Sequence, residues 1–223
     1  MALGDKAILK EIEQGNIIID PYRRDNLKTS SYDVSLGECF FRERRPDNYV
    51  HLYNIYNKEH VERVWGKEHF SAEKASKVLK HFDFKGIAPE DKVILLEPGE
   101  TILGHTQEFI GGRGTITTMM KARSSLGRNF IEVCKCAGWG DVGYVNRWTM
   151  EITNNSRHYT IPLVVGRRVA QIIFFDVKEI EAKEYVSDGK YQSVKDFEKL
   201  KKSWSPQMML PRLYLDHEVR DSV

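Results

Sequence analysis

The sequence predicts a mainly β protein, built as a β-barrel or β-sandwich with a few peripheral helices. Short runs rich in β-branched and aromatic residues recur along the 223-residue chain, and turns rich in glycine or asparagine separate them. Few stretches have the apolar spacing of a helix, and the chain contains no internal repeat. We therefore expect a single domain over residues 1–223.

The N-terminal region predicts one short helix followed by strands. Asp5 is placed to cap this helix, and Gly15 is placed to end it in a left-handed conformation. The apolar residues that share one face of the helix are Ile8, Leu9 and Ile12. Residues 16–20 are rich in isoleucine and end before Pro21, and residues 31–37 alternate as a half-buried strand does.

Residues 42 to about 90 predict an α-containing insertion, because the sequence there becomes charged and rich in tyrosine and histidine. Ser71 is placed to cap a helix within it. The apolar face of that helix would contain Ala72, Ala75, Val78, Leu79 and Phe82. Beyond the insertion, the turn at residues 98–100 predicts a hairpin between strands at 93–96 and 101–103.

The rest of the chain predicts further strands and a helical tail insertion at about residues 193–204. The strands are expected at residues 116–119, 130–136, 148–153, 160–165 and 169–177. In the second strand, alternation would place Cys134 and Cys136 on one face as small apolar side chains rather than metal ligands. Ser193 and Asp196 form a capping-box-like pair before the tail helix. The apolar face of that helix would contain Val194, Phe197, Leu200 and Trp204.

Composition excludes several classes of protein. The chain carries 34 Lys and Arg against 32 Asp and Glu, so its formal charge of +2 is too small for a general nucleic-acid binder. No stretch is long and apolar enough to cross a membrane, and the N-terminus lacks the apolar core of a signal peptide. The odd count of three cysteines favours a reducing compartment. We expect a cytoplasmic protein that binds neither nucleic acid nor membrane.

The densest chemical segment is residues 121–128, which contains an ammonium group, two guanidinium groups and two hydroxyl groups. Arginine grips phosphate oxygens with a planar fork, serine adds hydroxyl donors, and Gly127 lets the backbone approach closely. Composition alone leaves two interpretations open, namely an anion site and a solvated charged turn.

Residues 137–146 predict a β-hairpin with glycines at its tight positions. Tyr144 at the tip can stack on a base or a sugar, and Asp141 can hold a water or a sugar hydroxyl. The alternative is an ordinary hairpin that faces solvent. Glu151 lies in the next strand, opposite the face of Met150 and Ile152. If its side faces a cleft, burial raises the pKa of the carboxyl group and makes it a usable general base; otherwise it is an exposed carboxylate.

Taken together, these segments resemble the dCTP deaminase branch of the dCTP deaminase and dUTPase superfamily. Their order matches the family, and there is no gap from Arg123 to Glu151. The resemblance covers most of the chain outside the insertion. The segments that carry it are 31–37 (SYDVSLG), 96–100 (LEPGE), 123–128 (RSSLGR), 137–146 (AGWGDVGYVN), Met150 with Glu151, Gly166 with Gln171, 189–192 (GKYQ), and Pro211 with Arg212.

The resemblance implies a distorted jelly-roll β-barrel of the dUTPase-like type, assembled as a homotrimer with active sites shared between neighbouring subunits. It implies a zinc-free reaction in which Glu151 takes a proton from the water that attacks C4 of cytosine, and delivers protons as ammonia leaves. Ser124 and the Ala137 backbone would help to place this water, and Arg128 would orient Glu151. The implied substrate-binding residues are Arg123, Ser125, Asp141, Tyr144, Gln171, Tyr185 and Lys190, with Mg²⁺ accompanying the triphosphate.

The sequence lacks the pattern of a zinc deaminase, which pairs an H-x-E segment with a later P-C-x-x-C segment. His60-Val61-Glu62 matches the first half, but the chain has no C-x-x-C. We interpret this match as a coincidence within the insertion.

The expected function is a hydrolase that deaminates dCTP, or a closely related cytosine deoxynucleotide, to dUTP in pyrimidine deoxynucleotide metabolism. One alternative is a dUTP pyrophosphatase or a bifunctional enzyme, in which Asp141 activates water at the α-phosphate. Another is a non-catalytic nucleotide sensor on the same fold. The loop differs from the family's I-D-P-G-W/F-x-G pattern at Gly140, Val142 and Asn146, which predicts an altered substrate preference or regulation.

Overall fold

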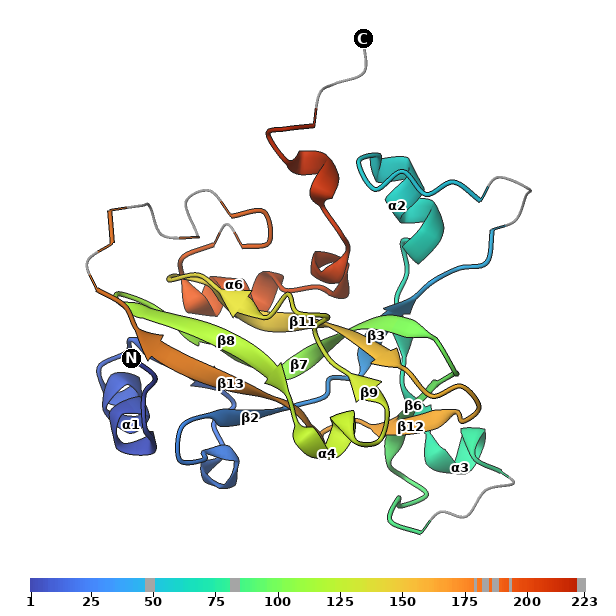
Figure 1. Cartoon of the computed structure of the whole chain (residues 1–223), viewed down its shortest axis with the longest axis horizontal. Coiled ribbons are helices and arrows are strands. Elements are labelled where there is room, and N and C mark those ends of the chain that lie inside the picture. Colours follow the sequence, from blue (N-terminus) through green and yellow to red (C-terminus); the bar gives the residue numbers. More distant parts are fainter. Residues whose placement is uncertain are drawn as a thin grey trace.

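Strands account for most of the regular secondary structure, and the helices lie at its edges (Figure 1). The computed structural model describes residues 1–46, 51–80, 85–178, 180–181, 185, 189–192 and 194–219. Within these residues the strands form three sheets. The prediction of a mainly β chain with a few peripheral helices is confirmed.

The largest sheet is organised around the long antiparallel pair of β7 (Thr101–Gly112) and β11 (Val145–Asn154). Its shorter strands are β1 (Ile17–Asp20), β3 (Cys39–Arg42), β4 (Phe70–Ser71) and β9 (Ile131–Glu132). The register of the central pair shifts between Arg147 and Thr149, where the Trp148 backbone N–H donates to Thr106 Oγ1 at 2.9 Å. A side chain therefore replaces a ladder bond at this bulge.

Two smaller sheets complete the β-structure. The four-stranded sheet contains β2 (Tyr32–Ser35), β8 (Ile116–Ala122), β10 (Trp139–Gly140) and β13 (Arg168–Asp176). The three-stranded sheet contains β5 (Glu73–Lys74), β6 (Lys92–Leu96) and β12 (Ile161–Val164). All of the pairings are antiparallel.

The main core combines side chains from the two larger sheets. Leu36, Met120, Met150, Ile172 and Phe174 are each at most 1% exposed. Because successive side chains of a strand point to opposite faces, the burial of Met150 turns its neighbours on β11 away from this core.

The helices are short and peripheral. They are α1 (Asp5–Glu13), α2 (Lys58–Trp65), α3 (Ala75–Val78), α4 (Ser124–Gly127) and α6 (Phe197–Ser203), with 3₁₀ turns η1 (Arg24–Asn26), η2 (Pro206–Met209) and η3 (Leu213–Leu215). The predicted N-terminal helix is confirmed, and Gly15 has a φ of 78°. Its N-cap, however, is Gly4, and Asp5 occupies the first turn, where a negative charge favours the helix dipole.

The helix expected after Ser71 is mostly absent. Ser71 belongs to β4 and pairs with Cys39, and only the single turn of α3 is helical. The apolar residues of this segment have helical spacing, but β5 pairs with β6 directly before α3, so a strand forms where the first helical turns were expected. Ala75 and Leu79 are still buried, against Val93 and Val164. Phe82 lies outside the described residues.

The prediction of a hairpin around residues 98–100 is wrong, although the turn itself is present. Gly99 has a φ of 76°, and the Glu100 backbone N–H donates to Glu97 O at 3.1 Å. The two flanking strands pair in different sheets, β6 with β5 and β12, and β7 with β1, β3 and β11. The turn therefore carries the chain from one sheet to another.

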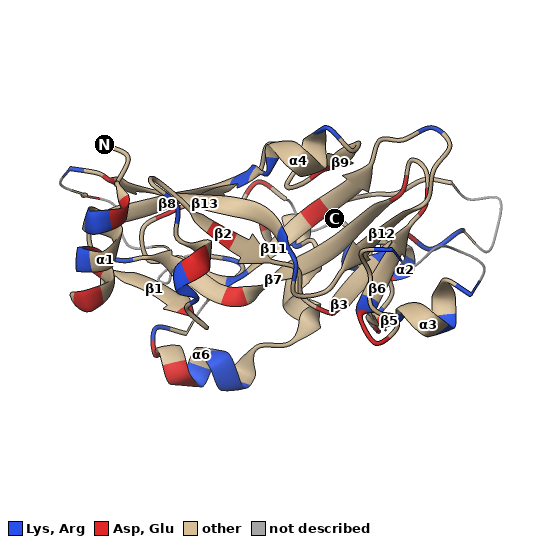
Figure 2. Ribbon diagram, turned by 90° about the horizontal axis from the view of Figure 1, so that it is seen from below, with Lys and Arg blue, Asp and Glu red and all other residues tan. Residues whose placement is uncertain are grey.

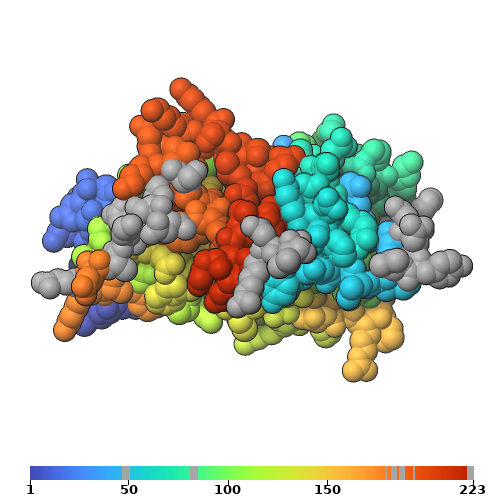
Figure 3. Space-filling model, turned by 90° about the horizontal axis from the view of Figure 1, so that it is seen from above, coloured from blue at the N-terminus to red at the C-terminus, as the bar shows by residue number. Residues whose placement is uncertain are grey.

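The tail packs across the largest sheet, next to the insertion (Figure 3). Asp196 caps α6 by accepting from the Lys199 backbone N–H, whereas Ser193 lies outside the described residues. The Arg147 guanidinium lies between the rings of Phe109 and Trp204, at 4.9 and 4.6 Å from their centroids. Further along, a separate apolar cluster joins Met209 to Phe41, Leu103 and Trp65. The tail and the insertion thus cover one face of the β7–β11 pair together.

Charges of both signs are mixed along the surface helices α1 and α6 (Figure 2). In the described ranges, no helix combines the length and the apolar character that a membrane crossing requires.

Gly111 allows a close approach between β7 and β11, and Gly111→Ala is expected to be strongly destabilising. An added Cβ would lie 1.9 Å from Tyr144 O and 2.8 Å from Val145 Cα, which are backbone atoms that cannot turn aside. We expect a loss of about 1 to 3 kcal/mol in the free energy of unfolding, measured by urea denaturation. Gly127→Ala is the matched control, because nothing lies within 4 Å of its Cβ position. Equal stability of the two variants would contradict this packing.

Candidate active site

A cavity of about 480 Å³ lies beside β11, and five of the predicted site residues line it. These residues are Ala137, Asp141, Tyr144, Glu151 and Tyr185. Tail residues Met209 and Pro211 also line the cavity, as does Trp65 of the insertion helix α2. Strand β11, its preceding loop, the tail and the insertion therefore meet at one place.

Glu151 lies on the face of β11 that borders this cavity. Strand alternation buries Met150 and Ile152 completely in the core, whereas Glu151 is half-buried on the opposite side. Burial raises the pKa of the Glu151 carboxyl group, and its own backbone N–H and the charge of Lys135 lower it less. The general-base interpretation requires the Glu151 side chain to be buried beside a cleft, and this condition is met.

The segment between β9 and Ala137 is a left-handed turn, which corrects the strand predicted at residues 130–136. Cys134, Lys135 and Cys136 have φ values of 64°, 32° and 65°. Cys134 is buried and Cys136 is exposed, so the two sulfurs do not share a face. Positive φ at non-glycine residues is strained, and it persists only where surrounding contacts hold the backbone.

Backbone hydrogen bonds hold this turn against β11. The Cys134 N–H donates to Glu151 O at 3.1 Å, and the Ala137 N–H donates to Cys134 O at 2.6 Å. The strained turn consequently places Ala137 on the same cavity as the Glu151 side chain.

The predicted hairpin at residues 137–146 takes a different form. β10 pairs with β8 rather than with β11, and the chain turns at Gly143, whose φ is 92°. The hairpin prediction failed because Gly140 packs against Thr118 and Trp148, where no larger residue fits. This turn leaves the Asp141 side chain exposed on the cavity wall.

Aromatic rings form much of the cavity wall. Tyr144 packs edge-on against Trp148 and Tyr185, with ring centroids 5.3 and 5.2 Å apart. Burial raises the pKa of both tyrosine hydroxyl groups, so both stay protonated. The Tyr185 N–H donates to Val142 O at 3.1 Å, which fixes Tyr185 against the loop. Apolar and aromatic walls of this kind suit a flat ring.

The basic motif lies away from this cavity. Ser124, Ser125 and Arg128 are exposed on or beside α4, and none of them lines the cavity. Arg123 directs its guanidinium to Arg168 O at 3.1 Å and to Asp33 at 3.8 Å. The structure of one chain thus divides the predicted site into two separate groups.

Gln171 and Lys190 also lie off the cavity. Gln171 pairs on β13 with Lys121 and Asp33 in the backbone ladder. Lys190 forms an ion pair with Asp216 of the C-terminal turn, and this pairing raises the pKa of its ammonium group. The neighbouring Tyr191 does line the cavity, so the GKYQ segment borders it through that ring.

The sequence reasoning missed several residues that line the cavity. They include Trp65, Trp139, Thr149, Tyr191 and Met209. Trp65 and Met209 lie far from β11 in the sequence, and no local signal shows that their segments pack beside it. Only the pattern of apolar residues in 206–211 hinted that this segment packs against something.

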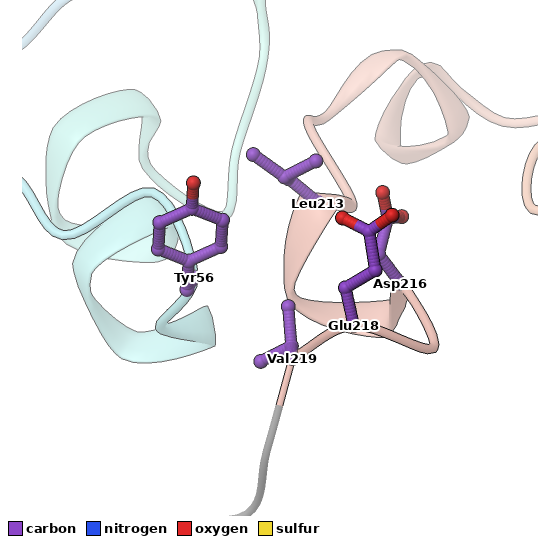
Figure 4. Close-up of a pocket in the computed structure, with 5 residues that line it drawn as sticks. All are labelled: Tyr56, Leu213, Asp216, Glu218 and Val219. Atoms are coloured by element: carbon purple, nitrogen blue, oxygen red, sulfur yellow. The ribbon is translucent and has the colours of Figure 1, made fainter.

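Another hollow, of about 430 Å³, separates the segment before α2 from the C-terminal turn (Figure 4). Tyr56 faces Leu213 and Val219 across it, and two carboxylates, Asp216 and Glu218, lie on one side. Its acidic side chains make it unsuitable for a phosphate.

The part of the chain that the structure describes contains no cluster of three His, Cys, Asp or Glu side chains able to hold a metal ion. A magnesium–triphosphate complex needs fewer protein ligands, because magnesium is usually held by one or two carboxylates together with phosphate oxygens and water. The described lining of the cavity includes the carboxylates of Asp141 and Glu151, which is compatible with a magnesium ion held mainly by phosphate oxygens and water.

Comparisons with known proteins agree with one another. A family model described as dCTP deaminase-like matches residues 2–177. The dUMP-forming dCTP deaminase of Hydrogenobaculum sp. (strain Y04AAS1) is 31% identical over 184 residues, which cover 81% of this chain and 85% of that protein. The dUMP-forming dCTP deaminase of Methanobrevibacter smithii is 27% identical over 173 residues, which cover 77% and 78%.

A solved structure has the same fold. The crystal structure of 2'-deoxycytidine 5'-triphosphate deaminase from Agrobacterium tumefaciens matches with a TM-score of 0.53 at 18% identity. The match covers 79% of this chain and 48% of that one, so the present chain spans about half of its length. The likeness confirms the predicted fold class. Because the family model matches well over half of the sequence, the chain belongs to the dCTP deaminase-like family.

Proposed function

We propose that this chain is a hydrolase that deaminates the cytosine base of dCTP. The observation that carries the proposal is the half-buried Glu151 carboxyl group, with its raised pKa, on the wall of an aromatic cavity. A general acid–base works best when its pKa lies close to the working pH. The family match and the names of the relatives support dCTP as the substrate.

In the proposed reaction, Glu151 moves protons between the attacking water and the base. The water oxygen adds to C4, the bond between C4 and the amino nitrogen breaks, and the oxygen remains as the uracil carbonyl. One water proton ends on N3 and the other on the amino group, which leaves as ammonia. The Ala137 backbone borders the same cavity and can help to place the water.

A homotrimer would complete the site. Ser124 and Arg128 are needed beside Glu151 for the implied mechanism, but α4 does not reach the cavity of its own chain. We therefore propose that α4 of a neighbouring subunit brings these groups, and Ser125, to the cavity. The exposure of Ser124, Ser125 and Arg128 supports this assembly, as does that of Phe130 and Trp139, which are 55% and 56% exposed.

A bifunctional reaction is favoured over deamination alone, because the two relatives compared above are both named dUMP-forming. In the second step a water attacks the α-phosphorus, the bond to the bridging oxygen breaks, and pyrophosphate leaves. Asp141 is the exposed carboxylate on the cavity that can take the proton of this water. Magnesium, when bound to the triphosphate, would shield its negative charge.

Glu151→Gln is expected to lower the deamination rate by about 10² to 10⁴-fold, because the amide cannot carry the proton. Ammonia release from dCTP measures the rate, and dCTP binding by calorimetry should remain close to that of the unaltered chain. Glu132→Gln on β9 is the matched control, since this carboxylate does not line the cavity. Near-normal turnover in Glu151→Gln would refute the mechanism.

Mixed trimers test whether sites are shared. Glu151→Gln and Arg128→Ala are each expected to be inactive when expressed alone. Co-expression should restore up to about a quarter of the sites, those in which the intact Glu151 and the intact Arg128 come from different subunits. If co-expression restores nothing, although each variant assembles with the mass of a trimer, both groups act within one chain.

Asp141→Asn separates the two proposed steps. We expect ammonia release to continue, and pyrophosphate release to fall by at least about 10²-fold because the general base is lost. The product should change from dUMP to dUTP, as resolved by ion-exchange chromatography. Equal losses of ammonia and pyrophosphate would show that Asp141 serves substrate binding instead.

A further inference from the structure

Trp65, the last residue of the insertion helix α2, lines the cavity that contains Glu151. It lies outside every segment that carries the family resemblance. Its side chain packs against an apolar cluster of Phe41, Leu103 and Met209, and the last two of these also line the cavity. Strand β7, the insertion and the tail therefore build one apolar wall of the candidate active site.

This apolar wall stands directly beside the Glu151 carboxyl group. The register of β7 and β11 pairs Leu103 with Glu151. Residues directly opposite each other in an antiparallel pair share a face, with their Cβ atoms about 5 Å apart. Because Trp65 packs against the cluster that contains Leu103, its indole ring and the Glu151 carboxyl group border the same part of the cavity.

The indole ring of Trp65 is held in place by the surrounding chain. The last turn of α2 is attached to the main domain, because the Arg44 backbone N–H donates to Val64 O at 2.7 Å. The indole N–H donates to the Tyr53 hydroxyl at 3.3 Å. This bond occupies the polar edge of the ring, so Trp65 offers the cavity an apolar aromatic surface. A side chain that is already ordered adds little entropic cost to ligand binding.

The other two tryptophans in the described lining of the cavity are placed differently. Trp148 is 4% exposed, and its indole N–H donates to Ile110 O at 2.9 Å within the core. Trp139 is 56% exposed and stacks on Phe175, with ring centroids 6.1 Å apart. Trp65 is half-buried and belongs to the apolar wall beside Glu151.

The proposed reaction determines which edge of the base meets this wall. C4 of cytosine must lie next to Glu151, because this carboxyl group moves protons between the water and the base. The ring neighbours of C4 are N3, which accepts a proton and needs polar surroundings, and C5, which carries only a C–H group. An apolar wall therefore matches the C5 side of the ring.

We propose that Trp65 is a specificity-determining residue that packs against the C5 edge of the cytosine and excludes substituents there. The proposal rests on the proposed deamination and adds the substrate class to it, namely cytosine deoxynucleotides without a group at C5. A rigid apolar wall discriminates by size, and one added carbon in a well-packed pocket typically changes kcat/KM by about 10- to 200-fold.

The test compares kcat/KM for dCTP and for 5-methyl-dCTP in the full chain, with ammonia release as the measurement. We expect the unaltered chain to prefer dCTP by at least about 10-fold. Trp65→Ala should reduce this preference by about 10-fold, because the cavity then opens beside C5. Tyr56→Ala is the matched control: it also removes an aromatic ring from the insertion, but Tyr56 does not line this cavity, and the preference should stay unchanged.

Trp65→Phe keeps the proposal testable if Trp65→Ala fails to fold, which thermal unfolding would show. The smaller ring should preserve kcat for dCTP within a few-fold and still reduce the preference several-fold. A purely structural role would slow both substrates equally in the folded variants and leave the preference intact, which would overturn the proposal. Equal use of the two nucleotides by the unaltered chain would overturn it as well.

Affinities separate this proposal from the proposed function. Calorimetry of dCTP and 5-methyl-dCTP with the Glu151→Gln chain measures the preference without turnover, and a second Trp65→Ala change should reduce it. If the unaltered chain releases no ammonia but the affinities show this dependence on Trp65, deamination fails and the role of Trp65 stands. If ammonia release is normal and the preference does not respond to Trp65→Ala, the role of Trp65 fails and deamination stands.

Discussion

The antiparallel pairing of β11 with β7 is the constraint on which the candidate site depends. It sets Glu151 opposite Leu103, and strand alternation then assigns Met150 and Ile152 to the core and Glu151 to the other face. A slip of one residue would bury the carboxyl group and expose the core side chains. The close approach at Gly111 and the side-chain bond of Thr106 at the bulge both support this register. The position of Glu151 is therefore determined by the packing of the whole sheet.

The face that carries Glu151 is covered by parts of the chain that lie far away in sequence. Arg147 lies four residues before Glu151 on β11, and its guanidinium group packs against the ring of Trp204 in the tail. Met209 and Trp65 line the cavity itself. Burial is the largest cause of the raised pKa of the Glu151 carboxyl group, and these segments form part of the wall around it. Their role follows from where they pack.

Strand alternation in the sequence was sufficient to predict the face of Glu151. The family resemblance grouped Ala137, Asp141 and Tyr144 with it, and all four residues line one cavity. Pairing partners were not predictable, because the turn at Gly99 is equally compatible with a hairpin and with a change of sheet. The left-handed turn at residues 134–136 contains no glycine, so no residue type indicated it. Its shape comes from hydrogen bonds to β11, and such long-range contacts are not visible in a local pattern.

The charged side chains around the cavity influence the pKa of the Glu151 carboxyl group. Among the residues that the structure describes, no arginine lines the cavity of Glu151, and a guanidinium group close to a carboxylate would lower the pKa of the carboxyl group. In one chain, burial raises the pKa of the carboxyl group, and no guanidinium group on the described wall of the cavity lowers it. Arrival of Arg128 from a neighbouring subunit would reverse this tendency and favour the ionised base. Assembly would then supply an electrostatic condition for catalysis as well as a missing contact, which is a physical reason for a site of this kind to be divided between subunits.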